Sequence, residues 1–231
     1  MTRPGQLVLD LAHAPVYAAA DFLSAPCNRD ARARIESWPA WSDFGLVLWG
    51  PEGSGKTHLA HLFRDRTGGI LVPAAALVVD DVPALARYAT VAVEDSDRGV
   101  GERALLHLHN LLRENGRSLL LTGRAPPSRW PVALPDLRSR LAALPIAAIG
   151  SPDDSLLEAV LFKLFADRQV RVGAEVVGFV LARMERSFAA ARTLVAAIDA
   201  AALAQGRPVT VPLVRAVMGL EERREDGGDG A

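Results

Sequence analysis

The sequence predicts an α/β fold in which a parallel five-stranded sheet flanked by helices is followed by a small all-helical domain. Three observations lead to this prediction. Short apolar runs alternate with helical patterns over the first 150 residues, an order typical of a parallel sheet. A glycine-rich loop joins one apolar run to a helix. After Gly150 only helical patterns follow.

The elements of the sheet follow from composition and periodicity. A continuous apolar run at 44–50, "FGLVLWG", ends in glycine and predicts a buried strand. The segment 102–115 has apolar residues at 105, 108 and 112, a helical stripe, and Gly116 is placed to end that helix. The other predicted strands are 70–72, 90–95, 118–123 and 143–149, and the other predicted helices are 30–38 and 55–66.

The pattern changes at "GSPDDSLLEAV". Ser151 suits the N-cap of a helix and Pro152 its first turn, and two aspartates complement the helix dipole. We therefore divide the chain into an α/β domain, 13–150, and a helical domain, 151–220, preceded by a flexible peptide, 1–12, and followed by a polar, disordered tail, 221–231. The predicted helices of the second domain are 153–168, 174–184, 187–204 and 211–219.

Composition excludes several classes of protein. Of the 231 residues 50% are hydrophobic, and no run of eighteen apolar residues or secretory signal is present, so we expect a cytoplasmic protein without a membrane span. The single cysteine, Cys27, fits a reducing compartment. A net charge of −1 argues against an extensive nucleic-acid surface. We therefore expect no direct sequence-specific DNA binding.

The segment "GPEGSGKT", 50–57, matches G-x-x-x-x-G-K-[ST] between a predicted strand and a predicted helix. Backbone amides of such a loop cradle phosphates, Lys56 reaches the β- and γ-phosphates, and Thr57 holds Mg²⁺. We expect ATP or ADP here. The predicted nucleotide contacts from this region are Gly50, Gly53, Ser54, Gly55, Lys56, Thr57 and His58.

A phosphate-loop strand needs a second strand that ends in acids for the metal. Two segments compete, "ALVVDDV" with Asp80 and Asp81, and "TVAVEDSD" with Glu94 and Asp95. The second is favoured because a helix and then the strand "SLLLTG" follow it. The histidines do not predict a zinc site, since no cysteines or acids complete a ligand set.

Taken in order, these motifs resemble the Hda family of DnaA-related AAA+ proteins. The segments that carry the resemblance are "DFLSAPCN" (21–28), "LTGRAPP" (121–127), "LPDLRSRL" (134–141), "ERSFAAARTLVAAID" (185–199) and "VTVPLVRAVM" (209–218). The resemblance implies an AAA+ base domain with a helical lid. It places Phe22 and Leu23 beside the adenine and makes Thr122 and Arg124 the sensor 1 region.

The resemblance also assigns arginines. Arg140 is the implied arginine finger, acting in trans on a nucleotide held by another subunit, with Arg138 as the alternative. Arg186 is the implied sensor 2 residue, with Arg192 as the alternative. Arg124 replaces the aspartate usual at sensor 1, and Glu94 and Asp95 replace the usual Asp-Glu pair. These departures imply weak hydrolysis by the chain itself.

Finally, "QLVLDL" resembles the Q-L-x-L peptide by which Hda-like proteins dock on the DNA polymerase sliding clamp. Gln6 would form hydrogen bonds while Leu7, Leu9 and Leu11 fill apolar pockets. An edge strand folded onto its own domain is the alternative. The resemblance thus implies a nucleotide-bound regulator, with ADP as its ligand, that docks on the clamp and stimulates ATP hydrolysis by DnaA.

The rival prediction is an autonomous P-loop ATPase, such as a helicase loader or a DnaA-like replication factor. A DNA-binding initiator is a third alternative, which requires a basic face that the sequence does not predict. The sequence leaves self-association into a homo-oligomer open.

Overall fold

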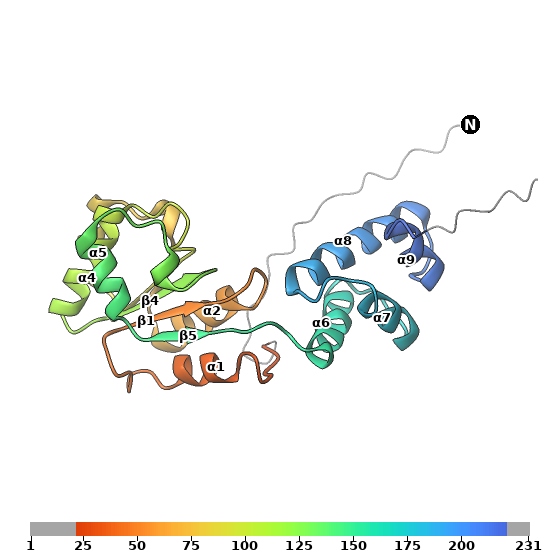
Figure 1. The fold of residues 1–231 in the computed structure, drawn as a ribbon, viewed down its shortest axis with the longest axis horizontal. Coiled ribbons are helices and arrows are strands. Elements are labelled where there is room, and N and C mark those ends of the chain that lie inside the picture. Colours follow the sequence, from red (N-terminus) through yellow and green to blue (C-terminus); the bar gives the residue numbers. More distant parts are fainter. Residues whose placement is uncertain (1–21, 221–231) are drawn as a thin grey trace, which may run out of the picture.

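The computed structural model describes residues 22–220, and Figure 1 shows a sheet domain joined to a cluster of helices. All pairings in the sheet are parallel, and the strand order is β2-β3-β4-β1-β5. This confirms the predicted five-stranded parallel sheet. The strands are β1 (Gly45–Trp49), β2 (Ile70–Pro73), β3 (Thr90–Glu94), β4 (Ser118–Gly123) and β5 (Ile146–Ala148).

Alternating side chains of the strands supply two apolar layers. Leu119 and Leu121 of β4 pack in one cluster with helices α3 (Val82–Leu85), α4 (Glu102–Glu114) and α5 (Pro135–Ala143). Leu120 faces the opposite cluster with α1 (Arg29–Glu36) and α2 (Lys56–Thr67). The sheet is therefore buried on both faces, which explains why its strands read as continuous apolar runs.

The structure confirms most predicted elements and adds detail. Leu105, Leu108 and Leu112 of α4 are fully buried, and Gly116 follows that helix with a φ of 61°. The sequence did not predict α5 as a helix, and part of the strand predicted at 143–149 belongs to its end. Short 3-10 turns complete the domain at η2 (Ala74–Ala76), η3 (Val79–Asp81) and η4 (Pro127–Arg129).

The second group of helices has its own core. Its members are α6 (Asp154–Asp167), α7 (Ala174–Leu181), α8 (Phe188–Gln205) and α9 (Val211–Val217). By length and composition α8 could cross a membrane, with a hydropathy of 1.3. However, its residues Ala191, Val195 and Ile198 pack into the core of this helical group.

One predicted helix cap is wrong. The N-cap of α6 is Asp153, whose carboxylate accepts a hydrogen bond from the Leu156 amide at 2.8 Å. Ser151 lies two residues earlier, and Pro152 is buried before the helix begins. Aspartate is as favoured at an N-cap as serine, so the two candidates were not separable by residue type.

Candidate functional site

The phosphate loop, residues 50–57, leads from β1 into α2 at the carboxyl edge of the sheet. Two of its glycines have positive φ, 75° at Gly53 and 96° at Gly55, where a residue without a Cβ is favoured. Ser54 between them is buried. A loop of this shape before a helix N-terminus forms a backbone cradle for anions. The predicted motif therefore has the backbone that its chemistry requires.

Lys56 begins α2 and is only 8% exposed. Its ammonium donates hydrogen bonds to the Gly50 carbonyl at 2.8 Å and the Pro51 carbonyl at 2.7 Å. Burial lowers the pKa of Lys56, while the nearby Asp95 carboxylate opposes that effect. A buried ammonium at the cradle is placed to neutralise phosphate. Thr57 is exposed on the same turn.

Strand order decides which acids adjoin the phosphate loop. Glu94 ends β3, and Asp95 follows it with a φ of 53°. The Asp95 amide donates to the Thr122 hydroxyl at 3.1 Å, so this turn is joined to the end of β4, the neighbour of β1. In contrast, Asp80 and Asp81 lie exposed in η3 outside the strands.

Glu94 and Asp95, the carboxylates near the phosphate loop, could bind a divalent cation only together with the phosphates of a nucleotide. Glu94 Oε1 is buried and has no hydrogen-bond partner within residues 22–220. Carboxylate oxygens suit Mg²⁺, which is usually held by one or two carboxylates together with substrate phosphates. Among the described residues no group of three His, Cys, Asp or Glu side chains could hold a metal ion. Glu94, Asp95 and Thr57 are therefore candidate Mg²⁺ contacts beside a bound nucleotide.

An ion pair links the phosphate loop to the sensor 1 region, residues 122–124. Arg124 Nη1 donates to the Glu52 carboxylate, although the two residues are 72 positions apart. The Arg124 amide donates to Asp97 Oδ2 at 2.7 Å. Sequence reasoning missed Glu52 and Asp97, because no local pattern marks contacts between separate strand ends.

The entry segment, residues 22–28, lies beside the start of α2. The Phe22 ring meets the His58 ring edge-on with 5.4 Å between centroids. A Cβ on Gly55 would come within 3.0 Å of Phe22, so the two residues are in close contact. Asn28 fixes the segment by donating to the Leu23 carbonyl at 2.9 Å. The structure thus places Phe22 against Gly55 and His58 at the start of α2, and the role of Phe22 and Leu23 beside an adenine stays a prediction.

The second helical group touches the phosphate loop through the first residues of α8. A Cβ on Gly53 would lie 3.0 Å from Phe188 Cβ and 3.1 Å from the Ala189 amide nitrogen. Sequence reasoning missed Phe188, although Ser187 in "ERSF" is a recognisable N-cap whose hydroxyl accepts from the Ala190 amide. Phe188 also belongs to a small apolar cluster, the junction cluster, made by Leu23, Ala25, Cys27, Leu156, Val160 and Phe188.

The two candidate finger arginines have different surroundings on α5. Arg140 pairs with Asp136 one turn earlier at 3.0 Å and keeps a third of its side chain exposed. The Arg138 guanidinium donates to the Val132 carbonyl, which ties it to the segment before the helix. Arg138 is thus bonded to backbone outside its helix, whereas Arg140 pairs within its helix, and both residues keep part of their surface exposed.

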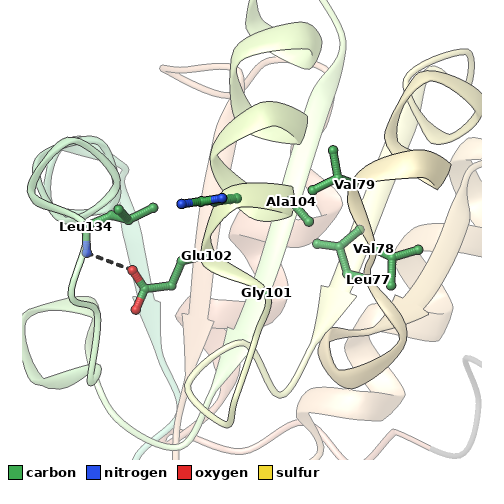
Figure 2. Close-up of a pocket in the computed structure, with 8 residues that line it drawn as sticks. Leu77, Val78, Val79, Gly101, Glu102, Ala104 and Leu134 are labelled. Carbon is green, nitrogen blue, oxygen red and sulfur yellow. Dashed lines mark hydrogen bonds between the residues drawn. The ribbon is translucent and has the colours of Figure 1, made fainter.

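A carboxylate on α4 fixes the start of α5. Glu102 accepts hydrogen bonds from the Ala133 and Leu134 amides at 2.8 and 2.7 Å, and Figure 2 shows the bond to Leu134. These two bonds lower the pKa of Glu102. The same residue lines a hollow of about 490 Å³ whose other wall carries the exposed side chains of Val78 and Val79. The hollow lies outside the phosphate loop.

Comparison with known proteins shows what the helical group is similar to. Residues 154–218 match the family model of the lid domain of Hda. The helical group is therefore similar to the lid domain of Hda. An uncharacterized protein of Haemophilus influenzae is 29% identical over 192 residues, which cover 76% of this chain and 81% of that protein.

Solved structures show that the Hda lid and the sheet domain together have the AAA+ fold. Domain III of the Thermotoga maritima initiation protein DnaA superposes with a TM-score of 0.74 and 16% identity, covering 88% of this chain and 95% of that domain. DnaA bound to AMPPCP and single-stranded DNA gives a TM-score of 0.63 at 16% identity, covering 79% and 64%. Thermotoga maritima RuvB also gives 0.63 at 16% identity, covering 84% and 68%.

Within the Hda lid, the two candidate sensor 2 arginines are placed differently. Arg186 forms a two-pronged ion pair with Asp154 at 2.9 and 3.2 Å, on an exposed part of the lid. Arg192 is exposed on α8, one helical turn after Phe188, the residue that meets the phosphate loop. Both assignments remain proposals.

The predicted clamp-binding residues lie outside the residues that the structure describes. They are Gln6, Leu7, Leu9 and Leu11. The boundaries of the peptide 1–12 and the tail 221–231 therefore stay predictions.

Proposed function

We propose that this DnaA-related AAA+ protein is a nucleotide-bound regulator of replication initiation that stimulates ATP hydrolysis by DnaA. The observation that carries the proposal is the Hda lid attached to a sheet domain with an intact phosphate loop. A DnaA-like fold supports a partner of the same class, because AAA+ modules commonly complete one another's sites. The proposed location is the cytoplasm.

The proposed ligand is ADP or ATP, with ADP as the resident form. Lys56 would neutralise the phosphates, with the loop amides around Gly53 as further donors. Phe22 and the junction cluster would cover the adenine, since they lie beside the loop and are apolar. The DnaA structure with bound AMPPCP supports an adenine nucleotide in this fold.

In the proposed mechanism Arg140 acts in trans. Its guanidinium stabilises charge that develops on a phosphoryl group in the site of DnaA, so the hydrolysed ATP belongs to the partner. α5 packs against α4 and η4, and the ion pair of Arg140 with Asp136 lies within α5. An arginine on an outer helix suits a neighbouring subunit.

The Arg140→Ala variant tests this mechanism. We expect it to bind nucleotide normally but to lose stimulation of DnaA hydrolysis by about 10³-fold or more, the usual value of a finger. Asp136→Ala is the matched control, because it breaks the same ion pair and keeps the guanidinium. Equal losses in both variants would show that the pair merely shapes α5. Full stimulation by Arg140→Ala would contradict the mechanism.

We further propose that the N-terminal peptide docks on the sliding clamp and raises the local concentration of the regulator near DNA. Replacing Gln6 and Leu7 by alanine should abolish clamp binding, measured by surface plasmon resonance, without lowering the melting temperature. An edge strand predicts the reverse result, because truncating a buried leucine costs about 2–5 kcal/mol.

The alternative function is an autonomous P-loop ATPase. The unpaired, buried Glu94 Oε1 favours it, because a carboxylate in that state beside the loop is available to a metal. A steady-state ATPase assay on the isolated protein separates the two proposals. Turnover at rates typical of motors, without DnaA, would support the ATPase.

A further inference from the structure

The ion pair between Glu52 and Arg124 joins the phosphate loop to the segment after β4. β1 and β4 are paired in register from Gly45 with Leu119 to Trp49 with Gly123, so their carboxyl ends lie side by side. The Gly50 amide donates to the Gly123 carbonyl at 3.2 Å, which holds the two loops together. The side chains that follow these strand ends therefore meet over the same space.

This pair lies within electrostatic reach of Lys56. Glu52, Arg124, Asp95 and Asp97 all act on the charge of the Lys56 ammonium. In a phosphate loop that lysine reaches the β- and γ-phosphates. The γ-phosphate of a triphosphate would consequently approach the ion pair. A diphosphate lacks this phosphate and would stay farther from the pair.

Hydrogen bonds hold the backbone around Arg124, whereas the side chains of Glu52 and Arg124 are partly exposed to solvent. The Arg124 amide is held by Asp97, and the Ser96 amide donates to the Thr122 carbonyl at 2.8 Å. The Glu52 side chain is 58% exposed and that of Arg124 is 32% exposed. Moving the guanidinium from carboxylate to phosphate therefore requires only side-chain rotation.

We propose that the Glu52–Arg124 ion pair is a specificity element that makes the site favour a nucleoside diphosphate over a triphosphate. The proposal rests on the nucleotide binding proposed above. Glu52 already neutralises Arg124, so a third phosphate must either take the guanidinium from Glu52 or lie beside its carboxylate. Both alternatives cost free energy, because like charges a few ångströms apart repel and a charge-assisted hydrogen bond is lost. A diphosphate meets neither cost.

Two variants change the balance in opposite directions. Glu52→Gln removes the negative charge and frees Arg124, so we expect the affinity for AMPPCP, an ATP analogue, to rise about tenfold. Arg124→Ala leaves the Glu52 carboxylate without its partner, so we expect the affinity for AMPPCP to fall by a similar factor. Affinity for ADP should change less than about twofold in both.

The experiment is calorimetric titration of the full chain with ADP and with AMPPCP. Asp167→Asn is the matched control, because Asp167 forms an exposed ion pair with Lys163 on α6 and lies outside the phosphate loop. The decisive quantity is the ratio of the two dissociation constants, which a general loosening of the loop would leave unchanged.

Three results overturn the inference, and they differ in what they say of the function. An unchanged ratio in Glu52→Gln, with both ligands bound, refutes the specificity element and leaves nucleotide binding intact. A parallel change in both variants shows that the pair only shapes the loop. Absence of ADP and AMPPCP binding in the natural chain refutes the proposed nucleotide site itself, and the inference with it.

Discussion

At the scale of single residues, two phenylalanines enclose the phosphate loop. Phe22 lies against Gly55, and Phe188 lies against Gly53. Both glycines have positive φ, so their backbone allows the approach that a Cβ would prevent. Phe188 is 6% exposed and belongs to the lid, and its Cβ and backbone join the loop to a domain that follows it by over a hundred residues. This contact makes the lid part of the candidate site.

Phe188→Ala should therefore affect both stability and ligand affinity. We expect the free energy of unfolding to fall by about 3 kcal/mol, the lower end for truncating a buried phenylalanine. We also expect a weaker affinity for ADP, because the junction cluster, which we propose covers the adenine, loses its aromatic ring. Chemical denaturation and calorimetry measure the two effects.

Phe165→Ala is the control for that experiment. Phe165 is fully buried in the lid core, away from the junction cluster. It should destabilise the lid at least as much and leave the ADP affinity of the folded protein unchanged. If both variants bind ADP equally well, the Phe188 contact has no part in the site.

At the scale of elements, hydrogen bonds with residues outside α5 hold the start of that helix. Its N-cap, Leu134, provides no side-chain cap. Instead Glu102 of α4 accepts hydrogen bonds from two amides before the helix, and Arg138 ties the Val132 carbonyl to the first turns. Because α5 carries Arg140, these bonds set the direction in which the proposed finger points.

Glu102→Ala should consequently free the start of α5. We expect faster hydrogen exchange at the Ala133 and Leu134 amides, measured by NMR at neutral pH, because their acceptor is gone. Glu114→Ala is a matched change at the other, exposed end of α4 and should leave both amides protected. Unchanged exchange in Glu102→Ala would mean that the loop is held by its remaining contacts alone.

The Glu102 carboxylate also predicts how the stability of the fold depends on pH. Its pKa is lowered below the ordinary value of 4.5, so the folded state binds the proton more weakly than the unfolded state. The stabilisation from this group is therefore fully present above pH 4.5 and is lost as the pH falls through the lowered pKa.

At the scale of the whole molecule, two domains with separate cores meet at the junction cluster. The sheet domain has an apolar cluster on each face, and the lid has a third. A hydrogen bond from the Gly150 amide to the Cys27 carbonyl, 2.8 Å long, joins the entry segment to the connection between domains. A ligand at the loop would touch both domains and the entry segment, so binding should stabilise the molecule as a unit.

ADP should accordingly raise the melting temperature of the full chain. At a free concentration of 100 times the dissociation constant, ligand binding contributes about 2.7 kcal/mol. Lys56→Ala should lose this increase, because the ammonium that neutralises the phosphates is removed. Thermal denaturation with and without ADP measures it. A variant that is still stabilised by ADP to the same extent would contradict the role given to Lys56.

The sequence by itself determined the order of elements and the phosphate loop. Continuous apolar runs, a helical stripe at Leu105, Leu108 and Leu112, and a glycine-rich motif are local patterns that burial on both faces of a sheet imposes directly. It also favoured Glu94 and Asp95 over Asp80 and Asp81, because the order of strands along the chain carries that information.

Only the tertiary structure decided which separate segments meet. The pairs Glu52 with Arg124 and Gly53 with Phe188 lie far apart in the chain, and no periodicity links their positions. The helix α5 was missed although Pro135 and Asp136 in its first turn are local start signals, and Glu102 and Arg138 also hold that start. The cap of α6 is Asp153 rather than Ser151, and because both residue types favour the N-cap, local preference did not separate them. Which distant segments meet depends on packing between elements, which local preferences of about 1 kcal/mol do not encode.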